Sequence, residues 1–407
     1  MTFLKIAFGN LKRNRRRTLS TIAVICVGVS MMALTNGFTD GVTASMSGSL
    51  VNQIDGHLRI EHRDYKKYAI TDQEKILIKD FRELADEVGR NPHVIAVMPR
   101  VLTGGLIGKD DKSTTFFATI SSFETLSKVL PDYANNLTAG EPLLPADPDG
   151  VLIGKALAQS LALNIGDEVA LLSKTVHGEQ SSALAHIRGI VTFPQDPIVE
   201  QSLIVAGMGK SMKENLLDIG EGATQLLVRL DDINNVPEVA ESLNRQFESQ
   251  NLPWRVVPWY ESKTYSQIVG MLNGINVVIM FILALMLGVI TSNALLMAFF
   301  ERINEIGSLR AIGMRKLEIR QLLYYEAAIT GAVGTLAGLA LGAALIFSAS
   351  HFGVPLGSFL NQLVRPTLTA ISFAASAVVP IIAIMAAATA PIRLATRMSV
   401  IESLNYR

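Results

Sequence analysis

The chain has 407 residues, of which 49% are hydrophobic and 18% charged, and its 36 Lys and Arg balance its 36 Asp and Glu. This zero net charge argues against a nucleic-acid-binding protein, which normally carries a basic excess. The high apolar content argues against a disordered chain. The single cysteine, Cys26, excludes an intramolecular disulfide, a cysteine-type zinc cluster and a CxxC redox site. A positive mean hydropathy with few charges is typical of a membrane protein.

Four long stretches of the sequence contain no Asp, Glu, Lys or Arg. Each holds about 20 mostly apolar residues, which is the length that crosses a hydrocarbon core of about 30 Å as a helix. The first stretch follows a basic segment, as a signal peptide does, but its apolar run is too long and no small-x-small cleavage site closes it. We therefore predict an uncleaved first span and transmembrane helices over residues 18–39, 271–300, 322–350 and 367–390.

The basic residues predict the orientation of these spans. Residues 1–17 contain six Lys and Arg and no acidic residue. By the positive-inside rule the N-terminus is cytoplasmic. Four spans then place residues 40–270 outside, 301–321 inside, the connection 351–366 outside and the tail 391–407 inside.

Residues 40–270 are too long to be a connecting loop and are expected to fold. Strand and helix patterns at both ends predict a discontinuous α+β subdomain made from residues 52–140 and 221–262, with a β-rich subdomain over 141–220 between them. Within it, residues 72–89 are expected to form one amphipathic helix. The predicted fold class is a four-helix membrane protein with a large α+β extracytoplasmic domain inserted between its first and second helices.

The motifs of several enzyme classes are missing from the sequence. There is no GxxxxGK[ST] phosphate loop, no HExxH, no GxSxG and no GxGxxG. His57 and His62 lie five residues apart on a probable strand, so they fall on opposite faces and make a poor metal pair. We expect no catalytic residue, cofactor or metal in this chain.

The segment between the second and third spans is amphipathic. Its apolar positions are Ile303, Ile306, Leu309, Ile312 and Leu317, and charged residues occupy the positions between them. A helix over residues 301–321 could lie in the headgroup layer or dock on a cytoplasmic partner.

The same segment reads ER-x-x-EIG-x-LRAIG from Glu301 to Gly313, and this motif resembles the coupling segment of the FtsX-like, MacB-type permeases of ABC transporters, also called the type VII or mechanotransmission group. The C-terminal APIRLATRMSVIESLNYR and the inserted VLIGKALAQSLALNIGDEVAL are similar to the same family. The resemblance implies a separate ATPase dimer, which binds ATP and Mg, and a second permease protomer that is identical or homologous. It also implies a set of ATPase-coupling residues: Glu301, Arg302, Glu305, Ile306, Gly307, Leu309, Arg310 and Gly313.

Within that family, the basic N-terminal segment, the span ending in NGF and the following GHLRI resemble the lipoprotein-releasing LolC/LolE permeases. This implies a multi-pass protein of the inner membrane that releases lipoproteins to a periplasmic carrier. The alternatives are MacB-like efflux of small molecules or peptides and FtsX-like signalling to a periplasmic partner.

Two further groups of residues are candidates by position. Gly334, Gly338 and Gly342 repeat every four residues in the third span, which permits close helix packing either within the protomer or across a dimer. Met31, Phe38 and Met46 lie near the outer end of the first span and are predicted, from position alone, to line a substrate path among membrane lipids.

Overall fold

The computed structural model describes residues 7, 9–10, 13, 15–144, 147–193, 200–355 and 363–397. The chain divides into two compact units. The helical unit comprises the chain up to Ser45, Ile268–Pro355 and the chain from Leu363. The second unit, called the inserted domain here, lies within Met46–Gln267.

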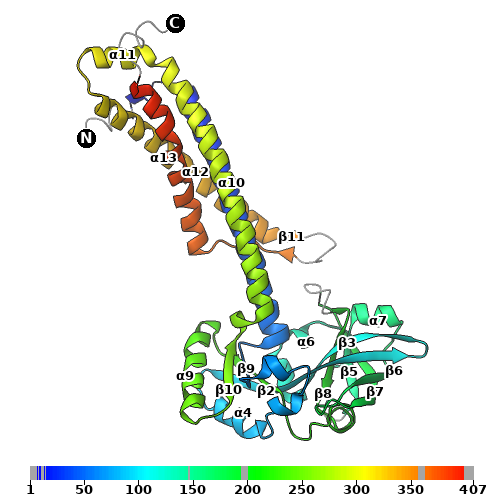
Figure 1. Ribbon diagram of the computed structural model, residues 1–407. Coiled ribbons are helices and arrows are strands. Elements are labelled where there is room, and N and C mark those ends of the chain that lie inside the picture. The colour runs from blue at the N-terminus through cyan, green and yellow to red at the C-terminus, as the bar shows by residue number, and fades with distance from the viewer. Residues whose placement is uncertain are drawn as a thin grey trace. The chain divides into compact units, whose positions relative to one another are not determined.

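The helical unit confirms the four predicted membrane helices (Figure 1). They are α2 (Arg15–Ser49), α10 (Lys263–Glu301), α12 (Lys316–Phe352) and α13 (Ala370–Arg397). Each helix extends beyond its predicted span at both ends, except at the start of α13. There Thr369 Oγ1 accepts a hydrogen bond from the Ser372 amide and caps the helix. A two-stranded sheet of β11 (Val354–Pro355) and β12 (Leu363–Val364) belongs to the same unit.

The single helix expected over residues 301–321 is divided in the structure. Helix α10 runs on to Glu301, a short helix α11 covers Ile303–Ala311, and α12 begins at Lys316. The division falls at Gly313, which has φ of 108°, a conformation that side chains with a Cβ rarely adopt. Leu317 therefore lies on α12 and not on the apolar face of α11.

The three glycines of α12 lie against α2 of the same chain. A Cβ atom on Gly334 would lie 2.6 Å from Ile25 Cγ2, and one on Gly338 would lie 2.6 Å from Val29 Cβ. At Gly342 it would lie 2.8 Å from Ala33 Cβ. Any larger residue would push the two helices apart, so these glycines set the spacing of α2 and α12.

A polar cluster joins three of the membrane helices at the end of the unit opposite Arg17. The Asn36 side chain on α2 donates to Ser376 Oγ on α13 at 2.9 Å and accepts from Asn276 Nδ2 on α10 at 2.9 Å. Polar side chains inside a membrane unit need such partners, because neither lipid nor apolar side chains can satisfy them. The cluster therefore ties α2, α10 and α13 together.

The inserted domain is built on one ten-stranded sheet in the order β10-β1-β9-β2-β3-β8-β5-β7-β4, with β6 pairing with β2 and β7. The strands are β1 (Leu58–His62), β2 (Val94–Lys109), β3 (Lys112–Ser121), β4 (Leu137–Gly140), β5 (Gly150–Gly154), β6 (Glu168–Lys174), β7 (Gln180–Val191), β8 (Leu203–Gly207), β9 (Gln225–Leu230) and β10 (Trp254–Pro258). The two predicted subdomains share this sheet, because the long strand β2 pairs with both β9 and β6, and β3 pairs with β8.

Short helices cover the sheet (Figure 1). They are η1 (Leu50–Asp55), α3 (Tyr65–Tyr68), η2 (Gln73–Ile76), α4 (Phe81–Gly89), α5 (Phe123–Val129), α6 (Asp132–Asn135), α7 (Lys155–Leu161), η3 (Ser211–Leu217), η4 (Ile233–Asn235), α9 (Val236–Ser249) and η5 (Trp259–Glu261). Helices α4 and α9 pack their apolar faces over β1 and β9, with Leu84, Leu243 and Phe247 buried against Ile60. A second core lies under α7 and η3.

The single amphipathic helix expected over residues 72–89 is wrong. The segment forms the short 3₁₀ helix η2, then an extended stretch in which Ile78 exchanges backbone hydrogen bonds with Ala223, and only then α4. The bridge to Ala223 satisfies the Ile78 backbone groups that a helix would have used internally.

Candidate coupling segment and substrate groove

Helix α11 is held on the helical unit by one apolar face. Ile303 and Ile306 are buried with Phe299, Ile319 and Ala395 in a small core. Gly307 is buried beside them. The predicted coupling residues Ile306 and Gly307 therefore face this chain's own helices, and α11 is packed against them.

The acidic residues of the segment also have partners within the chain. Glu301 Oε2 accepts a hydrogen bond from Arg17 Nη1 at 2.5 Å. Both carboxylate oxygens of Glu305 accept from Arg13 Nη2 at 2.5 Å, and Oε2 also accepts from Arg302 Nε at 3.1 Å. Three predicted coupling residues, Glu301, Arg302 and Glu305, are thus joined to the N-terminal segment.

Arg302 is the centre of this network. Its Nη1 donates to both carboxylate oxygens of Glu326 on α12, at 3.1 and 3.2 Å. Burial opposes the Arg302 charge, but the Glu326 and Glu305 carboxylates outweigh it and raise the pKa of Arg302. Burial of Glu305 is likewise outweighed by the Arg302 and Arg13 guanidiniums, which lower the pKa of that carboxyl. Both groups stay charged over the physiological pH range.

The other residues of the predicted segment surround an exposed apolar turn. Ile312 is 85% exposed, Leu317 61% and Leu309 36%. Gly313 forms the turn, and the Arg310 carbonyl accepts its backbone N–H at 3.1 Å. Large apolar side chains exposed together at a turn are a feature of surfaces that bind a partner. The predicted coupling set therefore divides into residues that face their own chain and this turn, which faces outward.

A groove runs between α2 and α10 in the helical unit. It has a volume of about 490 Å³, and all its lining residues are apolar: Ala23, Val24, Val27, Gly28, Met31, Leu283, Met286, Leu287 and Ile290. Of the three predicted path residues, only Met31 lines it. Phe38 and Met46 lie further along α2 and are half-buried. A groove of this composition can hold an alkyl chain, but it offers no charged or hydrogen-bonding side chain.

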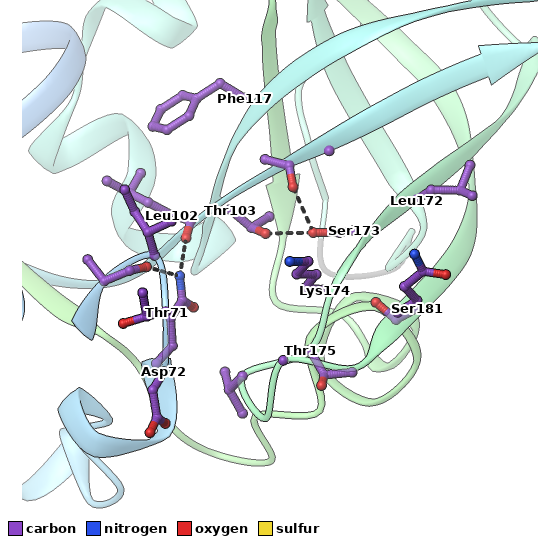
Figure 2. A pocket seen from close by; sticks show the side chains of 18 of the residues that line it. Thr71, Asp72, Leu102, Thr103, Phe117, Leu172, Ser173, Lys174, Thr175 and Ser181 are labelled. Atoms are coloured by element: carbon purple, nitrogen blue, oxygen red, sulfur yellow. Dashed lines mark hydrogen bonds between the residues drawn. The ribbon is translucent and has the colours of Figure 1, made fainter. Parts of the chain in front are cut away.

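The inserted domain holds a larger pocket of about 970 Å³ between β2, β6 and the segment around η2. Figure 2 shows Thr103 and Ser173 pointing toward one another in this pocket, where their hydroxyls lie 2.8 Å apart. Phe117 and Leu172 are 46% and 49% exposed and contribute apolar surface to the pocket. The pocket combines apolar and hydroxyl groups, and it includes none of the predicted site residues.

The sequence interpretation missed the partners of the coupling segment. Arg13 and Arg17 were recognised only as a topology signal, although they lie on the network. Asn10, whose Nδ2 donates to Glu326 Oε1 at 2.7 Å, carried no signal at all. Glu326 could have been found, because an acidic residue at the border of an apolar span needs a cationic partner. The C-terminal residues 398–407 of the predicted closing pattern lie outside the described residues.

Comparison with known proteins agrees with this architecture. Residues 18–246 match the MacB-like periplasmic core domain, and residues 277–400 match the FtsX-like permease C-terminal domain. The first match covers more than half of the chain. The chain belongs to the FtsX-like, MacB-type ABC transporter permeases.

Individual relatives are distant from this permease. The LolC lipoprotein-releasing transmembrane protein of Neisseria meningitidis is 21% identical over 81% of this chain and 76% of its own length. The macrolide export protein MacB of Hyphomonas neptunium is 23% identical over 86% of this chain and 54% of its own length. Among solved structures, the periplasmic region of MacB from Actinobacillus actinomycetemcomitans has a TM-score of 0.37 and 13% identity, covering 52% of this chain and 92% of that one.

Proposed function

We propose that this permease releases lipoproteins from the inner membrane, with energy from ATP hydrolysed by a separate ATPase dimer that binds ATP and Mg. The likeness to LolC relatives along most of the chain supports this proposal. In this arrangement the basic residues of the N-terminal segment lie in the cytoplasm and the inserted domain lies in the periplasm.

The observation that carries the proposal is the apolar groove between α2 and α10. The acyl chains of a lipoprotein are alkyl groups embedded in the outer leaflet, and each buried CH₂ contributes about 0.8 kcal/mol of transfer free energy. Met31 and Met286 are suited to such a ligand, because methionine side chains adapt to irregular apolar shapes. In this proposal the groove would face a second permease protomer, the acyl chains would enter it, and the protein part would pass to a periplasmic carrier.

The mechanism follows from the coupling segment. The partner ATPase binds the exposed turn at Ile312, and closure of the ATPase dimer displaces α11. Helices α2 and α10 are long and lack breaks over 35 and 39 residues, so they can transmit this displacement as stiff rods. Catalysis of ATP hydrolysis would reside entirely in the partner.

Depletion of the permease tests whether lipoproteins are its substrate. We expect outer-membrane lipoproteins to accumulate in the inner-membrane fraction as the protein is depleted, as measured by density fractionation and acyl labelling. A Met31→Asp variant should reproduce the accumulation, because a carboxylate in the groove opposes an alkyl chain. An unchanged lipoprotein distribution combined with sensitivity to exported compounds would instead favour MacB-like efflux, and a cell-wall defect without either would favour signalling.

A further inference from the structure

Within the described residues, the N-terminal segment contacts α11 through the side chains of Arg13 and Glu305. Helix α11 is connected along the chain to α10 through Arg302 and to α12 through the turn at Gly313. Helix α2 has no such connection to α11, so any displacement of α11 can reach α2 directly only through non-covalent contacts. Among the described residues, Arg13 pairs with Glu305 on α11, and Arg17 pairs with Glu301, the last residue of α10 before α11 begins.

The Arg13–Glu305 pair belongs to a larger network and does not stand alone. Isolated exposed ion pairs contribute little, but networks of several charges with good geometry do. Here Arg302 binds Glu305 and Glu326 at once, and Asn10 also binds Glu326. The Arg302 and Glu326 side chains are only 13% and 10% exposed, so the centre of the network is shielded from solvent.

Arg17 has a second attachment that fixes its position. Its Nη2 donates to the carbonyl oxygen of Ala294 at 2.5 Å, in the last turns of α10. The guanidinium therefore bridges the α10 backbone and the Glu301 carboxylate. Arg13, one turn earlier in the chain, reaches past this point to α11 itself. The two arginines together span the break between α10 and α11.

We propose that Arg13 and Arg17 make the N-terminal segment a second transmission arm, which passes displacement of α11 to the first membrane helix. The proposal rests on the proposed function, in which the partner ATPase moves α11. Arg13 and Arg17 are positioning residues in this mechanism, because they act through Glu305 and Glu301 and contact neither nucleotide nor cargo. Without them, displacement of α11 would reach α2 only through α10 and α12, which pack against it.

Charge reversal and charge swap at one pair test the inference. The full-length permease, with Cys26→Ser and a spin label on Glu248→Cys in the inserted domain, is reconstituted with its ATPase in proteoliposomes. The ATP-driven change in the distance between the labels of the two protomers is measured by pulsed electron paramagnetic resonance. We expect Arg17→Glu and Glu301→Arg each to lower the ATP-shifted population about fivefold or more, a typical factor for coupled sites.

The double variant Arg17→Glu/Glu301→Arg should restore the movement, because it rebuilds the pair with opposite polarity although it cannot restore the bond to Ala294. Arg16→Glu is the matched control, because it makes the same charge change at an adjacent exposed residue. The inserted domains of this variant should show the normal ATP-driven change in label distance. ATPase copurification and basal ATP hydrolysis should be unchanged in Arg17→Glu and Arg16→Glu, which lie outside the predicted coupling set.

Two outcomes would overturn the inference separately from the proposed function. Normal movement in both single variants would show that the pair does not transmit displacement. A double variant as defective as either single variant would show that the arginine acts in another way. Absence of ATP-driven movement in the protein with native residues 17 and 301 would contradict the proposed function itself, and the inference with it.

Discussion

At the scale of single residues, the inserted domain depends on one buried arginine. Arg100 on β2 is 1% exposed and heads the largest fully buried side chains of the described residues. Its guanidinium donates to Asp55 Oδ1 at 3.0 Å, to Gln225 Oε1 at 2.7 Å and to the Ile54 carbonyl. Asp55 also binds Arg59 at 2.7 Å. The network joins η1, β1, β2 and β9.

Arg100→Met should strongly destabilise the inserted domain. Without the Arg100 guanidinium, Gln225 Oε1 and the Ile54 carbonyl lose this donor, and the buried Asp55 carboxylate keeps Arg59 as its ionic partner. Loss of one partner of a buried ion pair costs about 3–5 kcal/mol. Denaturant unfolding of the full-length protein can be followed by tryptophan fluorescence, because both tryptophans, Trp254 and Trp259, lie in this domain. The control is Arg245→Met. The Arg245 side chain is 71% exposed, so this substitution should lower the free energy of unfolding by only about 0–1 kcal/mol. An equal loss of unfolding free energy in both variants would contradict the stabilising role of the buried Arg100 network.

Residue roles of this kind could not be predicted from the sequence. Arg100 follows a strand pattern and is one of many arginines, and its partners are 45 and 125 residues away. Glycine spacing, by contrast, was informative: Gly334, Gly338 and Gly342 indicated close packing, although only coordinates identify α2 as the neighbour. Local periodicity indicates which face of a helix or strand carries small or apolar side chains. It carries no information on which distant segment packs against that face.

At the scale of elements, the coupling segment shows how one motif serves two surfaces. The residues Glu301, Arg302, Glu305 and Ile306 bind or pack against the permease itself, whereas Leu309 and Ile312 are exposed. The amphipathic spacing predicted one continuous helix over residues 301–321. Spacing alone does not indicate the break in the helix that the backbone conformation of Gly313 permits. The turn displays Ile312 beyond the end of α11, where a partner can enclose it.

Ile312→Asp should weaken binding of the partner ATPase. Burying an exposed isoleucine in an interface contributes about 1.5–3 kcal/mol, so its replacement by a carboxylate should raise the dissociation constant about tenfold or more. Copurification and titration of the detergent-solubilised permease with the ATPase would measure this. The matched control is Ile371→Asp, because Ile371 is 83% exposed at the start of α13, a different part of the helical unit. Unchanged binding by Ile312→Asp would place the ATPase surface elsewhere.

At the scale of the whole molecule, the zero net charge conceals two opposite charges. Residues 39–270 hold 21 Lys and Arg against 31 Asp and Glu, a balance of −10, and the rest of the chain has a balance of +10. The inserted domain thus carries a net excess of acidic residues, and the rest of the chain carries a net excess of basic residues. Together with the positive-inside rule, this separation predicts the direction of insertion. The fold class was predictable from the four apolar stretches and from the strand and helix patterns between the first two.

The accessibility of single cysteines to a labelling reagent tests the predicted direction of membrane insertion. In a Cys26→Ser background, Glu248→Cys in the inserted domain should react with a membrane-impermeant maleimide in spheroplasts. Ile312→Cys should react only after the membrane is permeabilised, because the positive-inside rule predicts that the basic segments at 1–17 and 302–320 lie in the cytoplasm. Both side chains are exposed, so a lack of reaction reports the membrane barrier and not burial. The opposite labelling pattern would invert the topology and would remove α11 from the reach of any cytoplasmic ATPase.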